Sequence, residues 1–174
     1  LDFPRRVHPY DAAQGKVRAM DTISFSITTH RGCFGECRFC SIALHEGRTI
    51  ISRSEESIRA EALRLSAHPD FRGVIVDVGG APANMYGIDC ARKQTQGACP
   101  DKHCLTPRVC PSLKNDHSRQ IRLLAGLQKI PGVKNVFVAS GIRHDLLLAD
   151  QTQASAYLRR LARHHIWWRT SLRR

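Results

Sequence analysis

Thr29-His-Arg-Gly-Cys33-Phe-Gly-Glu-Cys37-Arg-Phe39-Cys40-Ser41 is the stretch that carries most of the chemical information in this sequence. Its three cysteines have the spacing C-x3-C-x2-C, so one short loop is able to turn three thiolates toward one point. Thiolates are soft ligands that suit zinc and iron–sulfur clusters better than magnesium or calcium. A four-iron cluster normally takes four cysteines, so three cysteines leave one iron open to another ligand. The pattern therefore favours an iron–sulfur cluster with an open coordination position.

Two other interpretations of the triplet stay open at this point. The cysteines could be structural, because cysteine is among the most buried residue types and often only packs. They could also bind zinc, with His30 or His45 as the fourth ligand. The cluster interpretation leads because three purely structural cysteines at this spacing, beside Gly32 and Gly35, would be a coincidence.

The residues around the loop predict an α/β fold. Thr22–Thr29 alternates apolar with hydroxyl residues, which is the pattern of a strand, and the cysteine loop follows its C-terminal end. A helix is expected to open at Ser54-Glu55-Glu56-Ser57, with Ser54 or Ser52 as its cap, and to end near His68-Pro69. A buried parallel strand is expected to follow over Gly73–Val78. Strand, helix and strand in this order form a βαβ unit.

The second half of the chain continues this alternation. A helix is expected from Asp116 or Ser118 to just before Pro131, then a strand over Val133–Ala139 and a helix over Gln151–His164. The sequence thus predicts three strand–helix units, with their chemistry at the C-terminal ends of the strands, where α/β folds carry it.

Residues 84–115 interrupt the alternation. They contain Cys90, Cys99, Cys104 and Cys110 and show no apolar periodicity. A structureless stretch of about 30 residues is uncommon in a compact domain unless something organises it. Four thiolates could do so by binding a second iron–sulfur cluster or zinc, although their spacing identifies neither metal. A disordered loop or scattered buried thiols are the alternatives.

The cysteine triplet resembles the signature of the radical S-adenosylmethionine (SAM) superfamily. Three longer stretches are similar to its YgiQ-like branch, and the likeness runs from about residue 1 to about residue 166: Arg31-Gly-Cys-Phe-Gly-Glu-Cys-Arg-Phe-Cys-Ser41, Asp77-Val-Gly-Gly-Ala-Pro-Ala-Asn-Met-Tyr-Gly87 and Val136-Phe-Val-Ala-Ser-Gly-Ile-Arg143. The resemblance implies an incomplete (β/α) parallel barrel of the radical SAM type. It also implies an enzyme that cleaves SAM reductively to a 5′-deoxyadenosyl radical, with an electron donor such as a flavodoxin or ferredoxin.

The same resemblance assigns roles to individual residues. Cys33, Cys37 and Cys40 would bind a [4Fe-4S] cluster, whose fourth iron is chelated by the amino and carboxylate groups of SAM. The aromatic ring of Phe39 would pack near the adenine. Gly79 and Gly80 stand where the family carries a Gly-Gly-Glu-like motif that binds the SAM amino group, although Ala81-Pro82 replaces the usual acid. Ser140 and Arg143 follow the third strand, where they could meet the SAM carboxylate or ribose.

Composition limits the remaining possibilities. The chain of 174 residues has a net charge of +12 and seven cysteines, an odd number that counts against a purely disulfide framework. No apolar run approaches the ~20 residues of a membrane span, and the N-terminus lacks a signal-peptide layout, so a cytoplasmic protein is expected. The positive charge makes nucleic acid a possible but not a favoured partner. The alternative function is therefore a noncatalytic, metal-stabilised basic module that binds RNA.

The expected organisation is a lead-in segment over residues 1–21, a partial radical SAM core over 22–166 and an atypical basic tail over 167–174. Without the lead-in and the 84–115 insertion, the chain is long enough for at most four strand–helix units, so it resembles the first half of a catalytic domain. The tail begins with Trp167-Trp168, where the family has a glycine-containing turn. We therefore expect the tail to be a frameshift product. Since the substrate-facing half is expected to be missing, no general acid or base is assigned and the chain alone is expected to be inactive.

Overall fold

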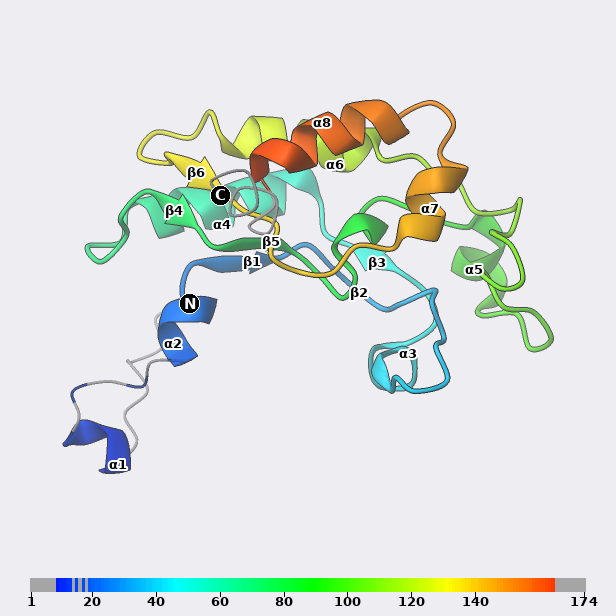
Figure 1. The fold of residues 1–174 in the computed structure, drawn as a ribbon, viewed down its shortest axis with the longest axis horizontal. Helices are drawn as coiled ribbons and strands as arrows, with labels where there is room; N and C mark the ends of the chain where they lie inside the picture. Colours follow the sequence, from blue (N-terminus) through cyan, green and yellow to red (C-terminus); the bar gives the residue numbers. More distant parts are fainter. Residues whose placement is uncertain (1–8, 14, 16, 18, 165–174) are drawn as a thin grey trace, which may run out of the picture.

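Parallel strand segments form the centre of the structure (Figure 1). The computed structural model describes residues 9–13, 15, 17 and 19–164. The parallel pairs are β1 (Ser26–Thr28) with β5 (Asp77–Gly79), and β4 (Val74–Ile75) with β6 (Asn135–Val136). The Val78 amide also donates to the Phe137 carbonyl at 2.9 Å. Residues 74–79 therefore lie between β1 and β6, and the spatial order of the three segments follows their order in the chain.

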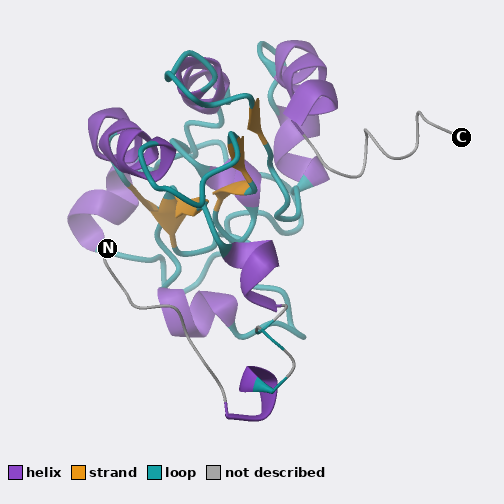
Figure 2. Ribbon diagram, turned by 90° about the vertical axis from the view of Figure 1, so that its left-hand side faces the viewer, coloured by secondary structure: helices purple, strands orange, loops and turns teal. Residues whose placement is uncertain are grey.

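Three longer helices cover these strands: α4 (Glu55–Ser66), α6 (Ser118–Leu127) and α8 (Ala154–His164). Figures 1 and 2 place them on the same side of the strands. The main hydrophobic core lies between the two layers and includes Ile27 and Ile75 from the strands and Ile58, Leu124 and Tyr157 from the helices. Within the described part of the chain the strands form small open sheets and no closed barrel.

The helix predicted after Ser54 is confirmed. The Ser54 hydroxyl accepts a hydrogen bond from the Ser57 amide at 3.1 Å, which satisfies one of the free amides of the first turn. Glu55 and Glu56 stand in that turn, where the positive end of the helix dipole favours negative charge. Ile58 and Ala62 then face the core and are fully buried.

The strand predicted over Thr22–Thr29 is wrong in its first half. Ala19–Ile23 form helix α2, and β1 begins only at Ser26. The hydroxyl groups of Ser24 and Ser26 donate to the carbonyls of Met20 and Ile23 at the end of the helix. Short hydroxyl side chains compete for backbone groups in this way, so the alternation that indicated a strand belongs partly to a helix terminus.

The other predicted strands are shorter than expected, and several helices were not predicted. Residues 73–78 contain β4 and the start of β5, and residues 133–139 contain only β6. Besides α2, the helices absent from the sequence prediction are α1 (Pro9–Ala12), α3 (Ile42–Glu46), the 3-10 helix η1 (Ala83–Met85), α5 (Ala91–Gln96) and α7 (His144–Ala149). The expected tail over 167–174 lies outside the described residues.

Residues 84–115 are not structureless. They contain the end of η1 and all of α5, and Met85, Ile88, Leu105 and Leu113 are buried. These side chains join Phe34 of the cysteine loop in a second hydrophobic core. Apolar packing on the loop therefore orders much of the insertion. The sequence did not predict this packing, because the apolar residues of the insertion are irregularly spaced.

None of the described helices combines the length and the apolar composition that crossing a membrane requires.

The main core predicts a clear contrast between two leucine positions. Leu124→Ala removes a fully buried side chain from α6, so we expect the free energy of unfolding to fall by about 2–5 kcal/mol. Leu63→Ala on α4 is the matched control, because that side chain is 43% exposed and should cost less than about 1 kcal/mol. Urea denaturation followed by circular dichroism measures both. Equal losses would contradict the placement of the core.

Candidate metal centre

The cysteine loop is tied at its base by a short hairpin. Strand β2 (His30–Arg31) pairs antiparallel with β3 (Ile51–Ser52), and the loop and α3 lie between them. The Cys33 amide donates to the Gly47 carbonyl at 3.0 Å. Gly32 has φ +92°, and a Cβ there would lie 2.1 Å from the Thr49 carbonyl oxygen, so only glycine fits. The backbone therefore fixes where the first cysteine of the triplet stands.

Cys33 and Cys37 present their sulfurs to the same small space beside Gly35. The Gly35 amide donates to Cys33 Sγ at 3.3 Å. A Cβ built on Gly35 would lie 3.2 Å from Cys33 Sγ and 3.5 Å from Cys37 Sγ, so any larger residue would intrude between the two thiols. The loop thus forms a cradle with two thiols around a residue that has no side chain.

Arg143, which is distant from the cysteines in the sequence, contacts this cradle. Its Nη1 donates to Cys37 Sγ at 3.2 Å, while its Nε donates to Asp145 Oδ1 at 3.0 Å. Burial would raise the pKa of Asp145, but the Arg143 guanidinium outweighs it and lowers that pKa, so Asp145 is ionised and holds the guanidinium. A role of Arg143 at the SAM carboxylate or ribose stays a prediction, and its contact with Cys37 was not predicted.

The protonation of the Cys33 thiol bears on metal binding. Burial raises the pKa of the Cys33 thiol, although the Gly35 amide and the Arg143 guanidinium both act to lower it. Since a thiol must lose its proton to bind a metal, binding at Cys33 would release a proton.

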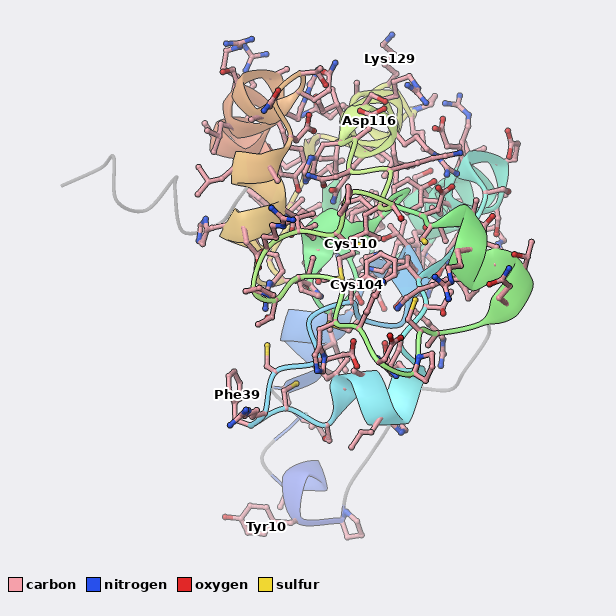
Figure 3. All side chains as sticks on the ribbon, turned by 90° about the vertical axis from the view of Figure 1, so that its right-hand side faces the viewer. Tyr10, Phe39, Cys104, Cys110, Asp116 and Lys129 are labelled. Carbon is pink, nitrogen blue, oxygen red and sulfur yellow. The ribbon has the colours of Figure 1, made fainter. Side chains whose placement is uncertain are left out.

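Phe39 and Cys40 follow the cradle in the chain. The Cys40 amide donates to the Cys37 carbonyl at 3.0 Å in a turn that leads into α3. Phe39 is 93% exposed and projects away from the body of the protein (Figure 3). Over the part of the chain that the structure describes, no three His, Cys, Asp or Glu side chains converge closely enough to hold a metal ion. The structure therefore brings together two of the three predicted ligands.

Neither candidate histidine joins the cysteines as a zinc ligand. His30 is buried, and its ring nitrogens lie 2.9 Å from the Thr29 hydroxyl and 3.1 Å from the Pro82 carbonyl oxygen. His45 is exposed on α3.

The predicted glycine pair packs tightly within the fold. A Cβ on Gly80 would lie 2.8 Å from the His30 ring, and one on Gly79 would lie 3.3 Å from Ala83 Cβ. Packing alone therefore requires glycine at residue 80. A role for this pair in binding a ligand stays a prediction.

Ser140 is held by an acid that the sequence reasoning missed. Its hydroxyl donates to Asp77 Oδ2 at 2.6 Å, and the Ala139 amide donates to Asp77 Oδ1 at 2.7 Å. Asp77 belongs to β5, so its carboxylate ties the end of the third strand segment to the second. The sequence did contain a signal for the role of Asp77, because an acid inside the apolar run Gly73–Val78 needs a polar partner.

The cysteines of the insertion pack near the loop. Cys90 and Cys104 are buried, Cys99 and Cys110 are half-buried, and the Cys110 amide donates to the Cys104 carbonyl at 2.8 Å. Figure 3 shows Cys104 and Cys110 as neighbours inside the insertion. Burial raises the pKa of the Cys104 thiol, against the opposing effect of the Lys93 ammonium. Cys90, Cys104 and Cys110 belong to the second hydrophobic core together with Cys33, whereas Cys99 does not.

Charged groups also join the insertion to the cysteine loop. Lys93 is 3% exposed, lies 4.9 Å from the centre of the Phe34 ring and donates to the Arg48 carbonyl. Arg48 forms an ion pair with Glu36 of the loop, and His103 Nδ1 lies 3.5 Å from the same carboxylate. The insertion and the loop are therefore one structural unit.

Comparison with known proteins gives this chain clear relatives. It is 51% identical over 166 residues to a UPF0313 protein of Fusobacterium nucleatum, which covers 95% of this chain and 29% of the relative. It is 48% identical over 165 residues to a UPF0313 protein of Methanocella arvoryzae, covering 95% and 27%. It is 46% identical over 164 residues to a UPF0313 protein of Thermotoga petrophila, covering 94% and 29%.

This chain is similar to UPF0313 proteins. It spans less than a third of the length of these curated relatives. No family model matches the chain.

Two buried histidines predict how stability depends on pH. Burial lowers the pKa of His30 and of His117, so both stay neutral in the folded protein below their usual value of 6.5. In the unfolded chain they bind protons as the pH falls through 6.5, which favours unfolding. We therefore expect the free energy of unfolding to decrease from about pH 7.5 to about pH 5.5.

Denaturant unfolding across this pH range measures the effect. His117→Gln should reduce the slope, whereas His45→Gln, at an exposed position, should leave it as in the parent. A parent protein whose stability is constant over this range would contradict the prediction.

Proposed function

We propose that this chain is part of a radical SAM enzyme in which Cys33, Cys37 and Cys40 bind a [4Fe-4S] cluster. The observation that carries the proposal is the cradle after β1, where the sulfurs of Cys33 and Cys37 face the same space beside Gly35. Three thiolates are the donor type that iron–sulfur clusters take, and they leave one iron open. Two of the thiols are already placed for the group, and Cys40, three positions after Cys37, would have to turn toward them as the third ligand.

The ends of three neighbouring strand segments support a SAM site beside the cradle. Gly79 ends β5 and Gly80 follows it, Ser140 and Arg143 follow β6, and the cysteine loop follows β1. Because these segments are parallel and adjacent, their carboxyl ends share one edge. Phe39, Gly79, Gly80, Ser140 and Arg143 are thus the proposed SAM-binding residues. Phe39 is exposed and free to close on an adenine ring.

The protein and its cofactors would divide the chemistry. When bound, a reduced cluster would supply the electron for reductive cleavage of SAM to methionine and a 5′-deoxyadenosyl radical. The residues of the chain would hold SAM in position and exclude water and competing reactions. The electron would come from a donor such as a flavodoxin or ferredoxin, and the substrate is not identified by the residues present.

The proposed architecture is an incomplete (β/α) parallel barrel. Three parallel strand segments in chain order, with their helices on the same side, are what the first part of such a barrel contains. The relatives are more than three times as long as the matched region, which leaves room for further units in those proteins.

The direct test is anaerobic reconstitution with iron and sulfide, followed by reduction in the presence of SAM. The parent chain should bind about four irons through the loop. Cys37→Ala should lose the iron–sulfur absorption and any production of 5′-deoxyadenosine, whereas Cys99→Ala, outside the second core, should retain the loop-bound cluster. Circular dichroism controls for folding. Full iron–sulfur absorption in Cys37→Ala would contradict the assignment of Cys37 as a cluster ligand.

The Cys33, Cys37 and Cys40 triple Ala variant also tests the insertion. If about four irons remain, the cysteines at 90, 99, 104 and 110 bind a second cluster. One zinc would indicate a structural site, and no metal would leave apolar packing as what orders the insertion.

A second candidate function is a noncatalytic module that binds RNA. The observation that favours it is a cleft of about 270 Å³ lined by Arg159, Arg160 and Arg163 of α8, with Ile121 and Ala156 as its apolar part. Neither α6 nor α8 contains an acidic residue. Across the residues that the structure describes, these three arginines have no carboxylate partner. Three unpaired guanidinium groups are suited to a phosphate backbone.

RNA binding is tested by fluorescence anisotropy with a single-stranded RNA oligonucleotide at several salt concentrations. Changing Arg159, Arg160 and Arg163 to Gln should weaken binding and reduce the salt slope by about 2. The control removes the same charge from three exposed arginines elsewhere, Arg38, Arg64 and Arg92. Equal losses of RNA affinity in both variants would mean that only net charge matters, and would contradict the cleft as the RNA-binding site.

A further inference from the structure

We propose that a buried chain of hydrogen bonds from Asp150 through His117 and Asn84 holds Arg143 against Cys37. Asp150, His117 and Asn84 would then be positioning residues for the candidate metal centre. Their effect on a bound cluster rests on the proposed function, but the hydrogen-bond chain itself is testable without a cluster.

Asn84 pairs with the backbone of Arg143 through both ends of its amide. Its Nδ2 donates to the Arg143 carbonyl at 2.9 Å, and the Arg143 amide donates to its Oδ1 at 2.7 Å. This pairing fixes which end of the Asn84 amide is oxygen, because a reversed amide would face donor with donor and acceptor with acceptor. Asn84 thus positions the backbone from which the guanidinium extends to Cys37.

His117 fixes the Asn84 amide through a second contact at Asn84 Nδ2. The second hydrogen of Asn84 Nδ2 points to His117 Nε2 at 3.3 Å, so this ring nitrogen must accept. His117 must then be neutral and carry its proton on Nδ1. Burial lowers the pKa of His117, which favours the same neutral ring. The ring also lies 4.6 Å from that of Tyr157, centre to centre, which restricts its movement.

Asp150 fixes the tautomer of His117. Its Oδ2 accepts from His117 Nδ1 at 2.7 Å and from the His117 amide at 3.1 Å. Its Oδ1 accepts from the amides of Thr152 and Gln153 at 3.1 and 2.9 Å, just before α8. Burial acts to raise the pKa of Asp150, but these hydrogen bonds outweigh it and lower the pKa to about 2, so the group is an ionised acceptor. One carboxylate therefore links the start of α6, the start of α8 and the ring.

The chain is more than generic core packing. Asn84, His117 and Asp150 are each 2% exposed or less, yet donors and acceptors match at every step. Such a network specifies one arrangement, because reversing any one of its groups would set a donor against a donor or an acceptor against an acceptor. Apolar side chains could fill the same volume, but they would leave the Arg143 amide and carbonyl without the partners they have here.

Arg143 is where this network reaches the candidate metal centre. Asp145 holds one side of the guanidinium, and Nη1 donates to Cys37 Sγ. Hydrogen bonds to the ligand sulfurs help to set the reduction potential of an iron–sulfur cluster. A donor that stabilises negative charge on sulfur favours the reduced state, so losing it should make the potential more negative.

The test weakens the anchor of His117 with a change that preserves shape. Asp150→Asn replaces one carboxylate oxygen with an NH₂ group, which must face either the two donors of His117 or the amides of Thr152 and Gln153, so the charged acceptor that holds the ring is lost in either orientation. Long-range ¹H–¹⁵N NMR of the parent should show neutral His117 protonated on Nδ1. In the variant this tautomer should lose population to the one protonated on Nε2, which faces Asn84 Nδ2 donor to donor and breaks the pairing that holds Arg143. A parent ring protonated on Nε2 overturns the proposal at once, even if the variant fails to fold.

The second arm measures the reduction potential of the reconstituted protein by an EPR-monitored titration. Asp150→Asn and Arg143→Ala should both make the potential more negative, and the double variant should shift no further than Arg143→Ala alone. Asp116→Asn is the control: this carboxylate accepts from the Ser118 amide and hydroxyl and acts on His117 through its charge alone, so the change should leave the potential unchanged. An unshifted potential in Asp150→Asn, or shifts that simply add, would overturn the positioning role. If the parent assembles no cluster, the proposed function fails, while the NMR arm still decides whether the hydrogen-bond chain exists.

Discussion

Parallel pairing of three short strand segments is the constraint on which the rest of the structure depends. β1 pairs with β5, and the amide of Val78 reaches across to the segment around β6. Parallel strands cannot be joined by tight turns, so helices must carry the chain back, and these helices supply the main core. The same pairing places the cysteine loop, Gly79-Gly80 and Ser140–Arg143 at neighbouring strand ends. Residues more than a hundred positions apart therefore meet at one edge.

The edge is stabilised mainly by polar contacts that cross between segments. Asp77 joins the second segment to Ser140 after the third, and Asn84 binds the backbone of Arg143. Arg143 in turn reaches Cys37 after the first segment. Each contact is charged or amide-based, so each fixes direction as well as distance. These contacts hold Arg143, which lies outside the cysteine loop, against the candidate metal centre.

The insertion supports the opposite side of the loop. Its apolar side chains share a core with Phe34, and Lys93 and His103 reach the loop and its flank through Phe34, Arg48 and Glu36. A buried ammonium group beside an aromatic ring and a carbonyl oxygen is costly to place, so it specifies how the insertion docks. The long cysteine-containing segment is thus part of the support of the loop, whether or not its thiols also bind metal.

The sequence by itself determined the main elements: the helix after Ser54, the parallel strand around Val74–Val78, and the cysteine triplet on a loop after the first strand. These follow from local patterns, namely a capping serine, a run of β-branched residues and ligand spacing. It misjudged the start of β1, because hydroxyl side chains that cap a helix end have the same alternation as a strand. Only the tertiary structure decided that Arg143 contacts Cys37, that the His30 ring binds Thr29 and Pro82, and that Asn84, His117 and Asp150 form one network. Those contacts join residues far apart in the chain, and no local spacing encodes which of many polar side chains will meet once the strands pair.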